Sequence, residues 1–183
     1  DAVLLGCGLG RGRQTDALVR RLMDLPQPLV LDADGINALA GHMDEWERRR
    51  GRVTVLTPHE GEFLRVGGNL SQGRTAAAED FARRSEAVVV LKGPGTVVAG
   101  PDGRCRVNTT GNCGMAKGGS GDVLSGVVLA LLGLGMDAFD ACCCAVWLHG
   151  RAGDLAAQEK GQWGMTPTDL LERLPQALRE VTE

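Results

Sequence analysis

The chain has 183 residues, of which 43% are hydrophobic and 23% are charged. This length and composition are typical of one globular domain with a buried core, and they exclude a disordered tail. The net charge is −3 and the longest basic run is Arg48 to Arg50, so nucleic acid and anionic membranes are excluded as electrostatic partners, and we interpret that run as a solvated helix end.

Residues 2–5 are apolar and predict a buried strand at the beginning of the chain. A loop that contains Gly8 and Gly10 follows and leads into a helix predicted over residues 14–24. The glycines do not keep the GxGxxG spacing, so this loop is weak evidence for a hydride-transfer cofactor.

A second apolar strand, residues 29–31, ends at Asp32 and Asp34. Open α/β sheets place their sites at the carboxyl ends of parallel strands. Asp34 either contributes to such a site or only caps a short helix over residues 35–41, and the spacing leaves both interpretations open.

The third predicted strand, residues 53–56, ends in a polar loop with His59, Glu60 and Glu62. His59 lies where a site is expected, so it is a candidate ligand contact or proton carrier. The two glutamates equally favour the first turn of the helix that they open. We interpret the other histidines as a surface residue, His42, and a hydrogen-bonded core residue, His149.

A helix is predicted over residues 72–84, with Ser71 as its cap, and a fully apolar strand over residues 87–91. A lysine and two glycines follow that strand directly, in the segment Lys92-Gly93-Pro94-Gly95-Thr96. This loop is compatible with phosphate binding, although the Walker A spacing is absent.

A β-hairpin is predicted from residue 96 to residue 107, with its turn at Asp102-Gly103. Helices are predicted further on over residues 123–134 and 138–158, and a last helix begins after Thr166 and ends near Val181. The longest apolar run lies in the first of these helices and is too short to cross a membrane.

The glycine-rich segment before these helices carries the clearest indication of chemistry. Gly118, Gly119 and Gly121 allow backbone N–H groups to face a ligand closely, and the next helix adds the positive end of its dipole. Asp122 stands at the junction, where a carboxylate can accept the proton of a hydroxyl that attacks a bound phosphate. Asp122 as a simple helix cap is the alternative, but Lys117 and Ser120 crowd the same turn and favour the phosphate site.

The six cysteines form no CxxC pair and show no spacing typical of a metal site. We interpret them as reduced thiols in small apolar positions, which indicates a cytoplasmic protein. Strands that alternate with helices predict an α/β fold: a mostly parallel sheet covered by helices on both faces, in a single domain over residues 1–183.

Five motifs, in order, resemble the ADP- or ATP-dependent NAD(P)H-hydrate dehydratases of the ribokinase-like superfamily. They are Gly6-Cys-Gly-Leu-Gly10, Leu31-Asp-Ala-Asp-Gly-Ile-Asn37, Thr57-Pro-His-Glu-Gly-Glu62, Lys92-Gly-Pro-Gly-Thr96 and Gly111-Asn-Cys-Gly-Met-Ala-Lys-Gly-Gly-Ser-Gly-Asp122. The resemblance covers the whole chain. It also implies an N-terminal βα portion that is expected to be missing here, and Cys113 replaces the family's usual proline.

The resemblance implies transfer of a nucleotide's terminal phosphoryl group to the hydroxyl of (6S)-hydrated NADH or NADPH, followed by loss of phosphate. By the same resemblance Asp122 is the catalytic base and contacts the substrate, together with Gly8, Gly10 and His59. ADP or ATP is expected with Mg²⁺ and without a dedicated set of metal ligands, and the Gly111–Ala116 segment favours ADP. The nucleotide would contact Lys92, Gly93, Pro94, Gly95, Thr96, Asn112, Gly118, Gly119, Ser120 and Gly121.

The resemblance further implies a homo-oligomer, a tetramer. Two alternatives stay open. One is a ribokinase-like kinase that phosphorylates a small alcohol, such as a vitamin precursor, and stops at the phosphoester. The other is a nucleotide-binding remnant without turnover.

Overall fold

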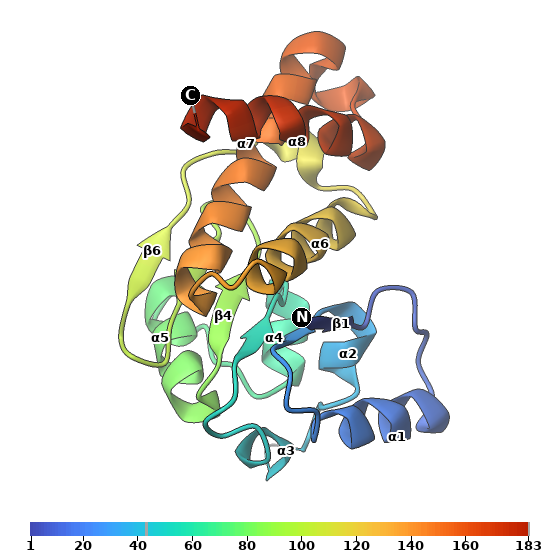
Figure 1. The fold of residues 1–183 in the computed structure, drawn as a ribbon, viewed down its shortest axis with the longest axis vertical. Helices are drawn as coiled ribbons and strands as arrows, with labels where there is room; N and C mark the ends of the chain where they lie inside the picture. The colour runs from blue at the N-terminus through green and yellow to red at the C-terminus, as the bar shows by residue number, and fades with distance from the viewer. Residues whose placement is uncertain (43, 183) are drawn as a thin grey trace.

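The computed structural model describes residues 1–42 and 44–182, and Figure 1 shows the arrangement of their strands and helices. Six strands form one sheet in the order β1-β2-β3-β4-β5-β6. Strands β1 to β4 are parallel to one another, whereas β5 pairs antiparallel with both β4 and β6. This arrangement confirms the mostly parallel sheet and the hairpin. Their bounds are β1 (Val3–Leu5), β2 (Leu29–Leu31), β3 (Thr54–Leu56), β4 (Val88–Leu91), β5 (Val97–Ala99) and β6 (Cys105–Val107).

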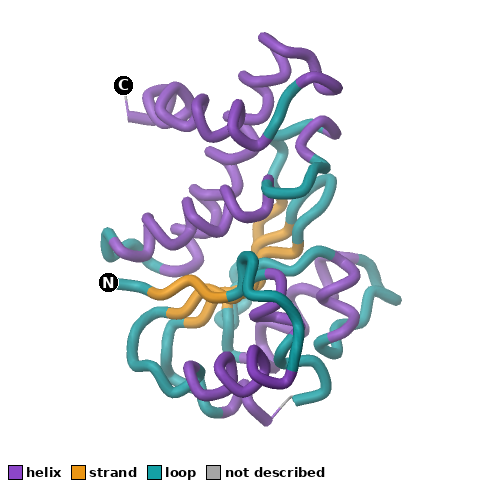
Figure 2. Tube along the Cα trace, turned by 90° about the vertical axis from the view of Figure 1, so that its right-hand side faces the viewer, coloured by secondary structure: helices purple, strands orange, loops and turns teal. Residues whose placement is uncertain are grey.

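Helices cover both faces of the sheet, as predicted, and Figure 2 shows them on either side of the strands. Because β1 to β4 follow one another in the same direction across the sheet, right-handed crossovers place their connecting helices on one face. Those helices are α1 (Arg13–Leu22), α2 (Ala33–Asn37), α3 (Asp44–Glu47), α4 (Glu60–Arg65) and α5 (Arg74–Ser85). The opposite face is covered by α6 (Ser120–Gly133) and α7 (Ala138–Gly164).

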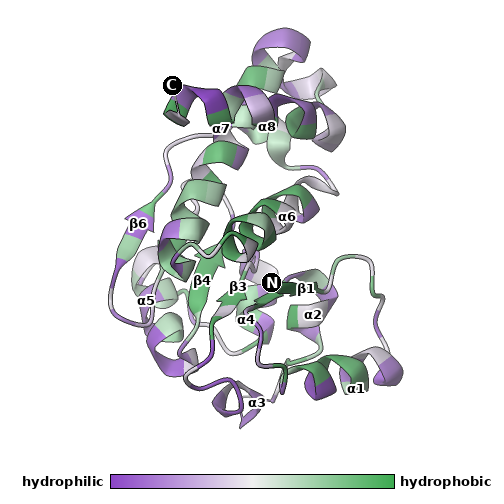
Figure 3. Cartoon of the chain, in the orientation of Figure 1, coloured by the Kyte–Doolittle hydropathy of each residue, from purple (hydrophilic) through white to green (hydrophobic). Residues whose placement is uncertain are grey.

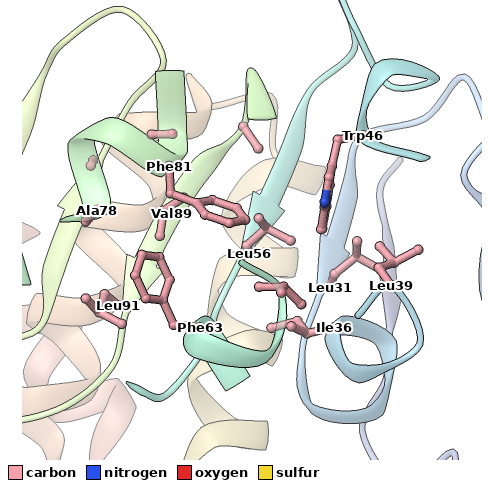
Figure 4. Close-up of a cluster of buried hydrophobic side chains, with 14 of the residues drawn as sticks. Leu31, Ile36, Leu39, Trp46, Leu56, Phe63, Ala78, Phe81, Val89 and Leu91 are labelled. Carbon is pink, nitrogen blue, oxygen red and sulfur yellow. The ribbon is translucent and has the colours of Figure 1, made fainter. Parts of the chain in front are cut away.

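Strand alternation decides which core each residue joins. Leu29 and Leu31 pack toward α1 to α5, whereas Val30 between them packs toward α6 and α7. On the first face, Phe81 lies between Phe63 and Trp46, with ring centroids 5.2 and 6.2 Å away (Figure 4). Burial of each such side chain contributes about 1.5–3 kcal/mol. Among the described residues, the face away from α6 buries more hydrophobic side chains than the α6 face, so it contributes more to stability.

The helices α6 and α7 pack side by side on the sheet, and Figure 3 shows apolar colour along most of α6. The third apolar cluster joins α7 to α8 (Pro167–Thr182). A short 3-10 helix, η1 (Cys113–Met115), belongs to the segment between β6 and α6. Among residues 1–42 and 44–182, no helix combines the length and the apolar content needed to cross a membrane.

Several predicted helix boundaries were wrong, and local capping explains two of them. The helix expected at residue 35 begins at Ala33, because Asp32 is its N-cap and accepts a bond from the Ala33 N–H at 2.9 Å. The cap is therefore Asp32 and not Asp34. The helix expected at residue 123 begins at Ser120, after a left-handed Gly119 with φ of 96°.

Other differences lie further from the strand exits. The helix expected at residue 72 begins at Arg74, after Gly73 and not after Ser71. α7 continues to Gly164 across a kink at Gly161. Arg49 is not solvated, since only 2% of its surface is exposed, whereas Arg48 and Arg50 are exposed.

Candidate functional site

The site lies where the exits of the parallel strands meet the beginning of α6. The loops after β1, β2, β3 and β4 reach the same edge of the sheet because these strands point the same way. The exits of β3 and β4 are joined directly, since Lys92 N–H donates to the Pro58 carbonyl at 2.8 Å. His59 and Lys92 form an isolated parallel bridge there.

A buried ion pair lies at the centre of this edge. Lys92 Nζ donates to Asp32 Oδ1 at 2.7 Å, and Asp32 is 1% exposed. Ser125, in the second turn of α6, donates to the other oxygen, Oδ2, at 2.6 Å. Thr57 Oγ1 lies 3.3 Å from Ser125 Oγ, so the exits of β2, β3 and β4 are tied to α6 through side chains.

Asp122 is exposed in the first turn of α6, and the structure gives no support to its role as a cap. The N-cap residue is Gly119, and no side chain caps this helix. The carboxylate of Asp122 lies with that of Asp32 and the thiol of Cys7 in one group whose ligand atoms are all within 4.8 Å of one another. Asp122 therefore faces the meeting point of the loops.

Cys7 does not fill an ordinary apolar position. Its Sγ lies 3.8 Å from Asp32 Oδ2, and burial, with the charges of Asp32 and Asp122, raises the pKa of the thiol to about 12. Mg²⁺ is a hard cation that binds oxygen ligands, so the Cys7 sulfur is poorly suited to it. The exposed Asp122 carboxylate is the member of this group best suited to a hydrated, phosphate-bound Mg²⁺.

The glycines of the turn before α6 differ in their surroundings. A Cβ added to Gly121 would lie 3.2 Å from Lys92 Nζ, so this glycine brings the backbone against the ammonium. Ser120 is buried, and its carbonyl is bonded to His149 Nε2 at 2.9 Å, which confirms that His149 is hydrogen bonded. Burial lowers the pKa of His149 to about 4, so the ring is neutral at physiological pH. Gly118 is exposed, with open space around it.

The second predicted phosphate loop lies next to this turn. Gly93, Pro94 and Gly95 are exposed, and Thr96 Oγ1 donates to the Gly93 carbonyl at 3.0 Å. Arg74 in α5 holds the loop from beneath by donating to the carbonyls of Leu91, at 2.9 Å, and of Pro94. The backbone of this loop, and not the Lys92 side chain, is its exposed surface.

Two polar residues of the 111–119 segment are engaged within the protein. Asn112 donates from Nδ2 to Asp154 Oδ1 at 3.0 Å, and its Oδ1 accepts from the Gly114 N–H at 3.0 Å. Lys117 donates to carbonyls at the end of α7, including that of Trp163 at 3.0 Å. These side chains shape the loop. Both the donor and the acceptor of the Asn112 side chain are already hydrogen bonded within the protein, so its main contribution is to hold the loop in place.

The predicted substrate contacts lie in two exposed loops. His59 is the N-cap of α4, where its Nδ1 accepts from the N–H groups of Gly61 and Glu62 at 3.0 and 3.3 Å. His59 therefore does cap the helix, and only its Nε2 is left to contact a ligand. That nitrogen lies 3.4 Å from Glu62 Oε1. Gly8 and Gly10 are exposed beside Cys7, with φ of 69° and 75°.

The sequence interpretation placed Asp32 at a strand exit without giving it a role, and it missed Ser125 and Cys7 as parts of the site. Strand alternation would have indicated the place of Asp32 in the site, because Asp32 continues the face of Val30, and Lys92 continues that of Val90. Both faces point to α6, so the two charges had to meet beneath its first turn.

Comparisons with known proteins agree on one group of relatives. The profile of a family described as NAD(P)H-hydrate dehydratase matches residues 1–176. A bifunctional NAD(P)H-hydrate repair enzyme of Thermofilum pendens is 45% identical over 188 residues, which cover 100% of this chain and 36% of that protein. An ADP-dependent (S)-NAD(P)H-hydrate dehydratase of Bacillus subtilis is 37% identical, over 95% of this chain and 62% of that protein.

Solved structures give the same result. An ADP/ATP-dependent NAD(P)H-hydrate dehydratase from Bacillus subtilis, co-crystallised with ATP and Mg²⁺, superposes with a TM-score of 0.86 at 35% identity, over 98% of this chain and 64% of that one. The chain therefore spans between about a third and two thirds of the length of these relatives.

Proposed function

Because the chain belongs to the NAD(P)H-hydrate dehydratase family, we propose that it restores NADH and NADPH from their C6-hydrated forms with ADP or ATP as phosphoryl donor. The observation that carries this proposal is the exposed Asp122 carboxylate at the first turn of α6, beside a fixed lysine and two glycine-rich loops. A base next to a polyphosphate cradle is what transfer of a phosphoryl group to an alcohol requires.

The first step of the proposed reaction is phosphoryl transfer. Asp122 accepts the proton of the C6 hydroxyl as its oxygen bonds to the terminal phosphorus, while the bond from that phosphorus to the bridging oxygen breaks and releases AMP or ADP. The N–H groups of residues 118–121 and the positive end of α6 would stabilise the charge on the phosphoryl oxygens. The ADP preference follows from the family resemblance of the Gly111–Ala116 segment.

The second step is elimination. The C6–O bond breaks and releases inorganic phosphate, the neighbouring ring carbon loses a proton, and the ring double bond forms. Phosphorylation promotes this step because phosphate leaves far more readily than hydroxide. Mg²⁺, when bound with the nucleotide, would neutralise phosphate charge, and Asp122 is the residue that would hold it through its water ligands.

The binding roles are divided between the two sides of the site. We assign the nucleotide to the exposed loop Gly93 to Thr96 and to the turn Gly118 to Gly121, with Lys92 and Asn112 supporting them. Gly8, Gly10 and His59 lie in the remaining exposed loops and would contact the hydrated dinucleotide.

Two further parts of the proposal concern assembly and compartment. The cysteines that the structure describes are all free, which supports a reducing compartment such as the cytoplasm. The homotetramer rests on family resemblance, and light scattering of the purified chain would test it.

Product analysis tests the proposed function. The chain is incubated with C6-hydrated NADH, ADP and Mg²⁺, and we expect AMP, inorganic phosphate and reduced nicotinamide in equal amounts. A stable phosphoester without free phosphate would instead identify a kinase. Nucleotide binding without any product would identify a remnant, and either result would overturn the proposal.

A further inference from the structure

We propose that Asp32 is a positioning residue for phosphoryl transfer: with Ser125, it fixes the Lys92 ammonium beneath the first turn of α6, where that charge meets the phosphoryl group in transfer. This inference rests on the proposed function. It moves the Lys92 side chain from a general nucleotide contact to the reacting end of the nucleotide.

Asp32 holds other groups and does not itself react. Its Oδ1 accepts from Lys92 Nζ at 2.7 Å and from the Ala33 N–H at 2.9 Å. Its Oδ2 accepts from Ser125 Oγ at 2.6 Å and faces the Cys7 thiol at 3.8 Å. A carboxylate has about four acceptor positions. All of them are engaged by protein donors, so no lone pair remains for a substrate proton or a metal ion.

The backbone around Asp32 is fixed as firmly as its side chain. A Cβ on Gly6 would lie 1.7 Å from the Asp32 carbonyl oxygen, and one on Gly35 would lie 2.3 Å from the Leu5 carbonyl oxygen. Ala33 has a left-handed φ of 46°, which is unfavourable for a residue with a side chain. Such strain persists only where the surroundings impose it, so the backbone beside Asp32 is held in one conformation.

The fixed lysine lies at the reacting end of the proposed nucleotide site. Its side chain is 19% exposed and its Nζ touches the space that a Cβ on Gly121 would need, one residue before Asp122. A free lysine spreads its charge over many rotamers, because its stem has four flexible carbons. Held by Asp32, the ammonium occupies one place and stabilises charge there without reorganisation during the reaction.

The competing interpretation makes an opposite prediction. If Asp32 acted only as a negative charge near a phosphate, its neutralisation would tighten ADP binding and would not slow the reaction. If it positions Lys92, neutralisation slows the reaction and leaves ADP binding nearly unchanged.

The test compares the parent chain with Asp32→Asn, Lys92→Met and the double variant. Asparagine is a matched replacement, because it keeps the size of Asp32 and the N-cap acceptor for Ala33. We expect Asp32→Asn to lower kcat about 10- to 100-fold with KM for ADP nearly unchanged. The double variant should be no slower than Lys92→Met alone, since Asp32 acts through the lysine.

Ser125→Ala is a second, smaller perturbation that leaves the ion pair in place, and it should lower kcat less than Asp32→Asn. Thermal unfolding of each variant separates loss of fold from loss of rate. Parent-like kcat in Asp32→Asn, or losses that multiply in the double variant, would overturn the inference.

The inference also has a test that does not need turnover. AMP with aluminium fluoride mimics the phosphoryl group between donor and acceptor. Asp32→Asn should weaken binding of this pair about tenfold while binding AMP alone like the parent. If the variant binds the mimic more weakly than the parent but the parent shows no turnover, the proposed function fails and the inference stands. If the parent and the variant bind the mimic equally, the inference alone is refuted.

Discussion

Replacing Arg49 by methionine should destabilise the chain strongly, although its neighbours in the same basic run should tolerate the change. The Arg49 guanidinium is buried and donates to the carbonyls of Val53 at 2.8 Å, Gln27 at 3.0 Å and Leu25. Its Nε donates to Thr54 Oγ1 at 3.0 Å. The side chain thus ties the loop after α1 to the beginning of β3.

The magnitude follows from the acceptors left behind. Arg49 Nη1 also donates to the Met23 carbonyl at 3.4 Å. A buried acceptor without its donor costs about 1–3 kcal/mol, and methionine leaves the carbonyls of Met23 and Gln27 in that state. The Val53 carbonyl keeps the Leu29 N–H at 3.0 Å, and the Leu25 carbonyl keeps Arg52 Nη1 at 3.5 Å. Part of this loss is offset, because methionine removes a charge that is costly to bury. Burial, followed by the nearby charge of Arg52, lowers the pKa of Arg49. We therefore expect a loss of about 3 kcal/mol in the free energy of unfolding.

Urea unfolding of Arg49→Met, Arg48→Met and Arg50→Met provides the comparison. The two controls are exposed and lose only surface ion pairs, to Asp24 and Glu45 or to Glu47 and Glu86, so each should change stability by less than about 1 kcal/mol. A loss for Arg49→Met no larger than that of the controls would refute the account of this buried cation.

Three other predictions concern the cores and the loop over α7. Gly150→Ala should weaken ADP binding in calorimetry, because the new Cβ would lie 2.7 Å from the Thr110 carbonyl carbon, whereas Gly126→Ala in open space should not; equal effects would contradict this. The free energy of unfolding should fall by up to about 3 kcal/mol as the pH is lowered from 6.5 to 4. In that range His149 binds a proton in the unfolded chain but stays neutral in the folded chain, where its pKa is about 4. His149→Gln should flatten that part of the profile, and an unchanged profile would exclude this histidine as its cause. Phe81→Ala should cost about 3–5 kcal/mol in urea unfolding, and a loss below 1 kcal/mol would contradict its central place in the core.

Much of the sheet and of the site edge was predictable because it depends on local patterns. Apolar runs of three to five residues gave the strands, and the polar residues that follow them had to share one edge. The glycine turn and Asp122 followed from the same reasoning. Strand alternation also contained the Asp32 and Lys92 pairing, although it was not applied to the strand exits.

The remainder depends on partners far away in the sequence. Arg49 is buried because a loop more than twenty residues earlier supplies most of its acceptors, and nothing beside it in the chain indicates this. Asn112 and Lys117 look like ligand contacts until α7 provides Asp154 and the end carbonyls of that helix. His59 caps a helix and also lies in an exposed loop, so its sequence neighbours could not separate a capping role from a ligand contact.

In the proposed reaction, Asp122 removes the hydroxyl proton during phosphoryl transfer. The most direct measurement is the initial rate of reduced-nicotinamide formation from C6-hydrated NADH and ADP, compared between the chain and Asp122→Ala at equal nucleotide occupancy. We expect a rate at least about a hundredfold lower in the variant, with ADP affinity largely unchanged. A variant that turns over at the parent rate would contradict it.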